Sequence, residues 1–407
     1  MAFECSPVSQ RLFKAIGFND NNENCVIEKK EDNEEGYQED FDLNKDGKIT
    51  PAEIKFYLAA NPTYYPEADR KEFPLTRTDK LELLNIFYKI LTDARITKNP
   101  ALIVDVFKET AVKMKQAQLD QAVILKVYTD AAIEARKLKE PYKIALALSS
   151  LAQHMYSTGM NKIDFIKLFE ESVITANKIK IEDKTYKAEV LKDISIRMFD
   201  SDLPQEAVRV ARAIELFGFR DGALREIALR FSQKGQFTEA IETALLLGHL
   251  PTKDNLLKEL ALQMAKAGRF IEAIRVTRLM EDQLKKGTLI TDILSELNPS
   301  KMKQSEIIII FKESIEAARA LSDPGIQGSA TRMIAIYISR ARLEKKDVIS
   351  LFHDTIRLAG EISDVNEKIK ALKDIFHSMR NAGLSAAEIK DTFRKANVKS
   401  YTPADSI

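Results

Sequence analysis

Hydrophobic residues recur with a helical period over most of the chain. From about residue 76 onward they return every three or four positions, with short polar breaks every 15–20 residues. Segment 79–94 is typical, with apolar residues at Leu81, Leu83, Leu84, Ile86, Phe87, Ile90 and Leu91. A stripe this wide predicts an amphipathic helix that is buried on more than one side. We therefore predict roughly seventeen helices with short turns, which favours antiparallel neighbours.

Within this pattern, three segments repeat at a constant spacing, namely 188–208, 221–241 and 254–274. Small residues coincide at Ser195, Ala228 and Ala261, which lets the two helices of each hairpin pack closely. In the middle copy the order is large apolar, apolar, small, large apolar, turn glycine, aromatic, then Ala-Ile. The residues are Leu224, Ile227, Ala228, Phe231, Gly235, Phe237, Ala240 and Ile241, and Gly268 marks the turn of the next copy.

This order resembles the tetratricopeptide repeat family, most clearly over residues 188–285. Each copy is slightly shorter than the usual unit and lacks its first Trp. A second, longer hairpin signature recurs at Phe107, Phe169, Phe311 and Phe352, and Phe393 follows Phe352 at the same interval as Phe352 follows Phe311. A single hairpin cannot bury both faces, so neighbouring hairpins must complete its core. We predict an all-α fold, a right-handed α-solenoid of antiparallel helical hairpins over residues 75–400.

Composition agrees with helices and narrows the function. The 407 residues include no Trp, 14 Gly and 12 Pro, too few for a many-turned barrel or sandwich. The 62 basic and 61 acidic residues create no global field for nucleic acid or acidic membrane. No apolar run is long enough for a membrane span or a signal peptide, so we expect a cytoplasmic protein. A bacterial effector exported without a cleaved signal would look the same. Cys5 and Cys25 form neither a disulfide framework nor a metal pair.

Residues 20–46 carry eleven acids and three bases, a net charge of −8, so the other residues sum to +9. We predict that residues 1–35 form a polar acidic arm that is partly disordered. Directly after it, the twelve residues 42–53 place oxygen-bearing side chains at alternate positions around a glycine, Gly47. The candidate ligands for a metal ion are Asp42, Asn44, Asp46, the carbonyl of Lys48, Thr50 and Glu53.

This spacing resembles the EF-hand calcium loop at every position that matters. The resemblance implies that Glu53 gives two oxygens to Ca²⁺ and that Ile49 pairs with a sister loop. Apolar residues flank the loop at Tyr37, Phe41 and Ile54, which outlines a single EF-hand over residues 36–62. We find no second loop, so the hand either pairs with another chain or packs on the first solenoid helices. Dockerin modules also use such loops, but they carry a duplicated pair on an exported protein, whereas this chain shows a single loop. We expect a dissociation constant of about 10⁻⁶ to 10⁻⁴ M.

No catalytic constellation is evident. The four histidines, at positions 154, 249, 353 and 377, stand in no metal or catalytic motif, and no phosphate-binding glycine motif occurs. We therefore expect a protein that is not an enzyme. The leading hypothesis is a calcium-binding scaffold for protein partners. The alternatives are a purely structural repeat protein with a stabilising calcium site and an RNA-binding helical repeat. Near-neutral charge argues against RNA.

The candidate partner groove follows the register of the three copies. The first helix of each copy carries one basic residue and, one turn further on, one apolar residue. In the tetratricopeptide repeat family, which these copies resemble, this helix lines the concave face. The residues are Lys192, Ile196, Arg225, Leu229, Lys258 and Leu262. An acidic ladder at Asp193, Glu226 and Glu259 lies beside them. The same charges would therefore serve equally as salt bridges between adjacent repeats, such as Lys192–Glu226 and Arg225–Glu259.

Overall fold

The structure is a computed structural model that describes Ser9 and residues 11–13, 26–28, 38, 40–61 and 73–398. The chain divides into two compact units, the first ending at Leu216 and the second beginning at Phe217. This boundary falls inside the predicted solenoid, between the first and second of the three repeated copies. Cys5, Cys25, Tyr37 and most of the predicted acidic arm lie outside the described residues.

The first unit begins with two very short strands and one helix. β1 (Ile27–Glu28) pairs antiparallel with β2 (Lys48–Ile49), and α2 (Pro51–Ala60) follows directly. Two-residue strands have little stability of their own, so their support must come from side-chain packing. A small apolar core provides it and joins segments that are distant in the sequence. Its members are Leu12, Phe13, Ile27, Phe41, Ile49, Ile54, Leu58 and Phe73.

Seven α-helices then form antiparallel hairpins in the first unit. They are α4 (Arg77–Ile96), α5 (Pro100–Gln116), α6 (Gln121–Ala135), α7 (Pro141–Ser157), α8 (Lys162–Ala176), α9 (Lys184–Asp200) and α10 (Pro204–Arg212), with the 3-10 helix η1 (Ile181–Asp183) before α9. Each helix packs against the next, and α7 also packs against both α5 and α9. These neighbours define a stack of two-layered hairpins.

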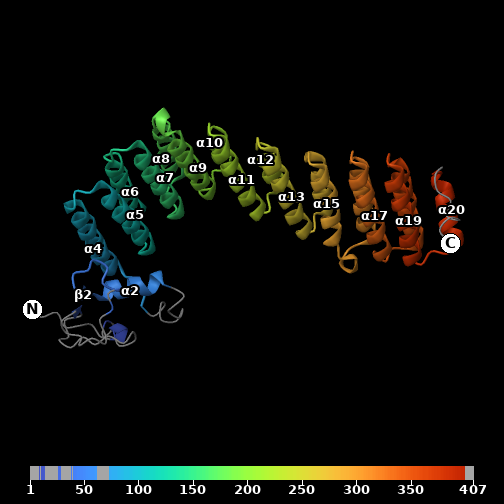
Figure 1. Cartoon of the computed structure of the whole chain (residues 1–407). Helices are drawn as coiled ribbons and strands as arrows, with labels where there is room; N and C mark the ends of the chain where they lie inside the picture. Colours follow the sequence, from blue (N-terminus) through green and yellow to red (C-terminus); the bar gives the residue numbers. More distant parts are fainter. Residues whose placement is uncertain are drawn as a thin grey trace, which may run out of the picture. The chain divides into compact units, whose positions relative to one another are not determined.

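The second unit continues the same scheme with ten α-helices. They are α11 (Phe217–Gln233), α12 (Phe237–Ala244), α13 (Leu250–Lys266), α14 (Phe270–Val276), α15 (Gln283–Ser295), α16 (Gln304–Arg319), α17 (Pro324–Arg340), α18 (Lys345–Glu361), α19 (Val365–Asn381) and α20 (Ala386–Ala396), with η2 (Thr277–Leu279) and η3 (Pro299–Lys301). The odd-numbered helices from α11 to α19 lie side by side in one layer (Figure 1). The seventeen helices between residues 77 and 396 confirm the predicted helical hairpins.

Local sequence explains where these helices begin. Thr76 with Asp79, and Ser385 with Glu388, form reciprocal capping boxes at the starts of α4 and α20. Elsewhere a side-chain oxygen accepts an N–H group that the first turn would otherwise leave unbonded. These capping residues are Asn99, Asp120, Asn161, Asp282, Asp323 and Asp364.

Many hairpin turns use one residue with a positive φ. Gly235 and Gly268 have φ of 75° and 83°, and Asp202 adopts 58° at the equivalent place of the first copy. The N–H of the following residue then reaches back into the last turn of the helix, as when Gln236 donates to the carbonyl of Phe231 at 2.9 Å. This arrangement closes the helix and aims the chain at the second helix.

The hairpins come in two sizes, as predicted. The second helices α10, α12 and α14 have 9, 8 and 7 residues, whereas α16 and α18 have 16 and 17. The repeated Phe signature does not mark one fixed place, however. Phe107 lies on α5, the first helix of its hairpin, whereas Phe169, Phe311 and Phe352 lie on second helices. All four are buried, so the signature reflects a buried helical face in either layer.

Two buried aspartates join consecutive hairpins in the second unit. Asp221 on α11 accepts N–H bonds from Gly248 at 3.2 Å and His249 at 3.0 Å. Asp254, at the equivalent position of the next copy, accepts bonds in the same way from residues 281–282 at 3.0 and 2.7 Å. Each carboxylate therefore fixes the turn that leads into the next hairpin.

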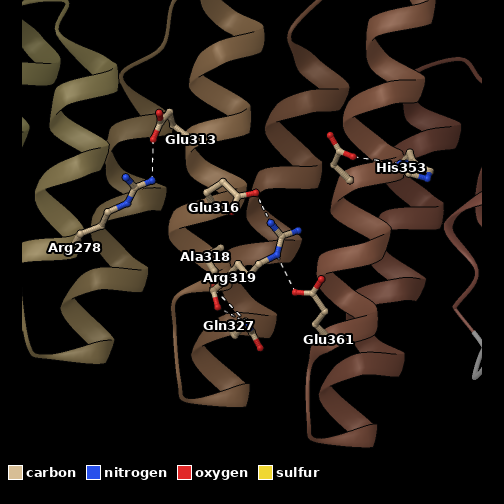
Figure 2. A network of polar contacts seen from close by, with 9 residues as sticks. Arg278, Glu313, Glu316, Ala318, Arg319, Gln327, His353 and Glu361 are labelled. Carbon is tan, nitrogen blue, oxygen red and sulfur yellow. Dashed lines mark hydrogen bonds and ion pairs between the residues drawn. The ribbon is translucent and has the colours of Figure 1, made fainter.

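Ion pairs add a second link between hairpins. Glu313 on α16 accepts bonds from Arg275 at 2.6 Å and Arg278 at 3.0 Å, one hairpin earlier. Arg319 at the end of α16 reaches Glu361 of α18 at 2.9 Å (Figure 2). Hydrogen bonding to Arg275 lowers the pKa of the Glu313 carboxyl. The arginine side chains of these pairs are partly open to water, so solvent screening weakens each pair.

Candidate metal centre

The candidate loop, residues 42–53, folds around two backbone positions with positive φ. Lys45 has φ of 56° and Gly47 has φ of 82°, a conformation that glycine adopts without steric cost. The first and last acidic residues of the loop are buried, with Asp42 3% exposed and Glu53 1% exposed. A loop with buried acidic residues at both ends must satisfy their oxygens internally.

Asp42 and Glu53 accept N–H bonds from across the loop. The Asp42 carboxylate accepts bonds from Asp46 at 3.2 Å and Gly47 at 2.8 Å. The Glu53 carboxylate accepts bonds from Leu43 at 3.0 Å and from the residue 50 amide at 2.9 Å. Glu53 thus reaches the residue next to Asp42, which brings the two ends of the loop together.

The remaining candidate ligands lie between these ends. Asn44 Oδ1 accepts a bond from the Asp46 amide at 3.0 Å, and Asp46 Oδ1 accepts one from the Lys48 amide at 3.1 Å. Thr50 caps α2, and its hydroxyl accepts a bond from the Glu53 amide at 3.3 Å. Lys48 belongs to β2, and because a lysine side chain contains no oxygen, only its backbone carbonyl could bind a metal ion.

The electrostatics of Glu53 follow from its burial. Burial, with a smaller contribution from the charge of Asp42, raises the pKa of the Glu53 carboxyl to about 7. Hydrogen bonds from Thr50 and Leu43 act in the opposite direction. An ionised Glu53 is therefore unfavourable in this loop unless a positive charge lies close to it. A cation close to this carboxylate would favour its ionised form.

The described residues contain no group of three or more His, Cys, Asp or Glu side chains arranged to hold a metal ion. Asp42, Asp46 and Glu53 therefore do not form a preassembled carboxylate cage. The loop offers carboxylate, amide, hydroxyl and carbonyl oxygens together, the chemistry that a hard divalent cation such as Ca²⁺ prefers.

The strand partner of the loop comes from the same chain. Ile27 faces Ile49 and Glu28 faces Lys48 in the β1–β2 pair, and both isoleucines are buried. For this strand the structure shows a partner within the same chain, residues 27–28, and pairing with another chain stays a prediction. Within the predicted arm, residues 1–35, these two residues form a strand, and the partly disordered arm stays a prediction. Packing on the first solenoid helices is present, since α2 contacts α4 and α5.

A sequence signal for this partner exists around Ile27. Four residues stand at the same offsets from Ile27 as Asp42, Asn44, Asp46 and Glu53 do from Ile49. They are Asp20, Asn22, Asn24 and Glu31. Cys25 replaces the glycine, which is why a search for a second glycine-containing loop fails. These five residues lie outside the described part of the chain.

Three contacts connect the loop and its helix to α4. Lys55 Nζ on α2 forms an ion pair with Asp79 at 2.9 Å, and both side chains are about nine-tenths buried. Phe56 and Phe87 make an edge-to-face contact with ring centroids 5.9 Å apart. On the loop itself, Lys89 Nζ of α4 lies 3.1 Å from Asp46 Oδ2. Sequence analysis missed all three, because no local pattern relates residues so far apart in the chain.

The predicted groove residues are divided between the two units. Lys192 and Ile196 lie on α9 of the first unit, and the other four lie on α11 and α13 of the second. In the second unit, the predicted inter-repeat salt bridge from Arg225 to Glu259 is present at 3.1 Å. The next one joins Lys258 to Asp292 of α15 at 2.8 Å. These bonds favour the structural interpretation of the ladder.

Comparisons with known proteins identify no family. No family model matches the chain, and no curated protein matches it. Ton1535 from Thermococcus onnurineus NA1 is 15% identical over 73% of this chain and 98% of that protein, with a TM-score of 0.34. A circular tandem repeat protein is 15% identical over 85% of this chain and 88% of that one, with a TM-score of 0.22. Likenesses this weak carry no argument, so the repeat architecture rests on the contacts between helices. No helix in the described part of the chain is both long and apolar enough to cross a membrane.

Proposed function

We propose that the chain is a calcium-binding helical-repeat scaffold with one Ca²⁺ bound by residues 42–53. The observation that carries the proposal is the burial of Asp42 and Glu53 at the two ends of one short oxygen-rich loop, whose ends the Glu53 carboxylate holds together. The ligands would be Asp42, Asn44, Asp46, Thr50, Glu53 and the carbonyl of Lys48. A bidentate Glu53 and a flexible set of oxygens suit Ca²⁺ better than the strict octahedron of Mg²⁺.

Isothermal titration calorimetry tests the calcium site directly. We expect the wild type to bind Ca²⁺ with a dissociation constant of about 10⁻⁶ to 10⁻⁴ M. Glu53→Gln should weaken binding by at least about 10- to 100-fold, the loss that removal of even an outer partner of a metal ligand causes. Glu82→Gln on α4 is a matched control and should bind like the wild type. Absence of heat up to millimolar Ca²⁺ would refute the proposal, and a stoichiometry of two would implicate residues 20–31.

Protein partners are the second part of the proposal. Support comes from apolar side chains exposed where one hairpin leads into the next in the second unit. Phe217 and Leu250, the first residues of α11 and α13, are 43% and 45% exposed and occupy equivalent positions of consecutive copies. Leu246 and Leu279, also equivalent to each other, are exposed just before the next first helix. Exposed apolar residues that recur in this way favour binding of a protein partner over binding of nucleic acid.

A pull-down performed with Ca²⁺ and with chelator tests this part. We expect a partner that the wild type retains, that Phe217→Ser with Leu250→Ser loses, and that depends on Ca²⁺. A partner retained by that double variant would refute the role of these exposed apolar residues.

A purely structural role for calcium is the second candidate function. It is favoured by the ladder charges Arg225 and Lys258, which already bond acidic residues of their own unit. On this alternative, Ca²⁺ raises the stability of residues 40–60 and changes no partner affinity. Identical pull-downs with Ca²⁺ and with chelator, together with calcium binding by calorimetry, would favour it.

A further inference from the structure

One candidate ligand of the loop is already bonded to a positive charge from the repeat. Asp46 Oδ2 lies 3.1 Å from Lys89 Nζ, and its other oxygen accepts the Lys48 N–H bond, also at 3.1 Å. Both oxygens of this carboxylate are therefore engaged by donors of the protein. The pair is partly open to water, with side-chain exposures of 50% for Lys89 and 31% for Asp46.

The position of Lys89 is set by the packing of its helix. Phe87, close before it on α4, is fully buried and contacts Phe56 of α2. The buried ion pair between Lys55 of α2 and Asp79, near the start of α4, is a second contact between the same two helices. Because α2 begins within the loop, these contacts keep Lys89 within reach of Asp46.

We propose that Lys89 is a tethered cation that competes with Ca²⁺ for Asp46, so that the first helix of the repeat sets the calcium affinity of the loop. The inference rests on the proposed calcium function. An ion at the loop centre needs an Asp46 oxygen, and the ammonium of Lys89 then loses its partner and faces a divalent charge. The two cations cannot share the carboxylate without repulsion.

The size of the effect is modest and depends on salt. An exposed pair in water is weak, so we expect Lys89→Met to tighten Ca²⁺ binding by about 3- to 10-fold at low ionic strength. The gain should shrink in about 0.5 M KCl, where screening shortens the range of the interaction to a few ångströms. By linkage, Ca²⁺ must loosen the contact between Lys89 and Asp46 by the same factor.

Calorimetry with Ca²⁺ alone tests the affinity on the full chain. Lys89→Arg keeps the charge and should bind within about twofold of the wild type. Lys126→Met removes one charge from α6, which packs on α5 and α7, and should also match the wild type. Equal affinity of Lys89→Met and the wild type at low salt would overturn the inference and leave the calcium function intact. Absence of binding in all variants would refute the calcium function itself.

Chemical labelling gives a second measurement that does not depend on affinity. Acetylation of Lys89 by a water-soluble reagent, followed by mass spectrometry, should accelerate when Ca²⁺ is added to the wild type. Glu53→Gln should show no acceleration, and Lys126 should label equally with and without Ca²⁺. An unchanged rate at Lys89 in a wild type that binds Ca²⁺ would contradict the exchange of one cation for the other.

Discussion

Buried carboxylates have different roles in the two regions of this molecule. In the second unit, Asp221 and Asp254 each accept N–H bonds from the turn that leads into the next hairpin. In the candidate loop, Asp42 and Glu53 accept N–H bonds from within the same short segment. The first pair joins elements that lie far apart in the sequence, whereas the second pair folds one segment onto itself.

The difference lies in what else surrounds each carboxylate. The Asp254 carboxylate accepts N–H bonds from residues 281–282, and these donors stabilise its negative charge. Around Glu53 there are further acceptors, and the charge of Asp42 adds to the burial that raises the Glu53 pKa. A buried carboxylate beside donors stabilises the fold, whereas one beside other acceptors favours a cation.

The largest expected effect separates these roles by stability. Asp254→Ala should destabilise the second unit by about 1–3 kcal/mol, because two N–H groups in a part-buried turn lose a charged acceptor. Asp42→Ala should leave the second unit unchanged and affect only the loop. Segment-resolved hydrogen exchange measures each region by itself. Equal protection of residues 250–295 in Asp254→Ala and the wild type would contradict a structural role for Asp254.

Glycine substitutions should give the next largest effect. Gly268→Ala should cost about 1–2 kcal/mol: the added Cβ would meet no atom within 4 Å, so the cost comes from the positive φ of 83°. Gly218 also has open space around it but an ordinary helical φ, so Gly218→Ala should be neutral or slightly stabilising. Gly47→Ala should instead weaken Ca²⁺ binding. Thermal unfolding and calorimetry measure these changes, and equal melting of the Gly268 and Gly218 variants would contradict the assignment.

Reversal of the ladder charges should have a smaller effect. Arg225→Glu with Lys258→Glu removes two exposed inter-hairpin bonds and should cost at most about 1 kcal/mol each. If partner binding is unchanged while the melting temperature falls, the ladder is structural. If stability holds and binding weakens in a salt-dependent way, the groove is the partner site. Glu239→Lys on α12 provides a surface control.

Acidic pH should produce the smallest effect on stability. It acts through Glu388, whose pKa is lowered, whereas the pKa of Glu53 is raised. Hydrogen bonds from Lys345 and Ser385 lower the pKa of Glu388 to about 2 from its ordinary 4.5. The folded state therefore binds the proton less tightly than the unfolded state, and this contribution to stability is present above pH 4.5. It is lost as the pH falls toward 2. Amide exchange in α20 at about pH 5 and about pH 2.5 should show this change, and Glu388→Gln should remove it.

The regular features of the fold could be predicted from the sequence. The helical period gave the hairpins, and Gly235 and Gly268 gave their turns, because both signals are local. The loop could also be located, since Asp42 and Glu53 frame a motif of fixed spacing. Asp221 could not be assigned its role, because an acidic residue on a helix usually faces water and its partner Gly248 lies in a distant turn.

The connections of the loop were beyond sequence reasoning for the same reason. Ile27 lies in a polar, Asn-rich stretch, so no strand pattern marks it. Lys89 stands among the ordinary surface charges of a helix, and contacts between α2 and α4, such as Phe56 with Phe87, bring it to Asp46. The division of the chain after Leu216 has no visible signal, because it separates two copies of the same repeat.

Because Ile27 pairs with Ile49, the loop cannot be moved into another protein with all of its contacts. A transplanted segment of residues 42–53 would leave behind the strand beside β2, the packing of Leu12 and Phe13, and the lysine that reaches in from α4. The smallest segment that keeps all these contacts of the loop therefore extends from Leu12 to Lys89 of α4. Insertions between these parts would be selected by their effect on the site as well as on the fold.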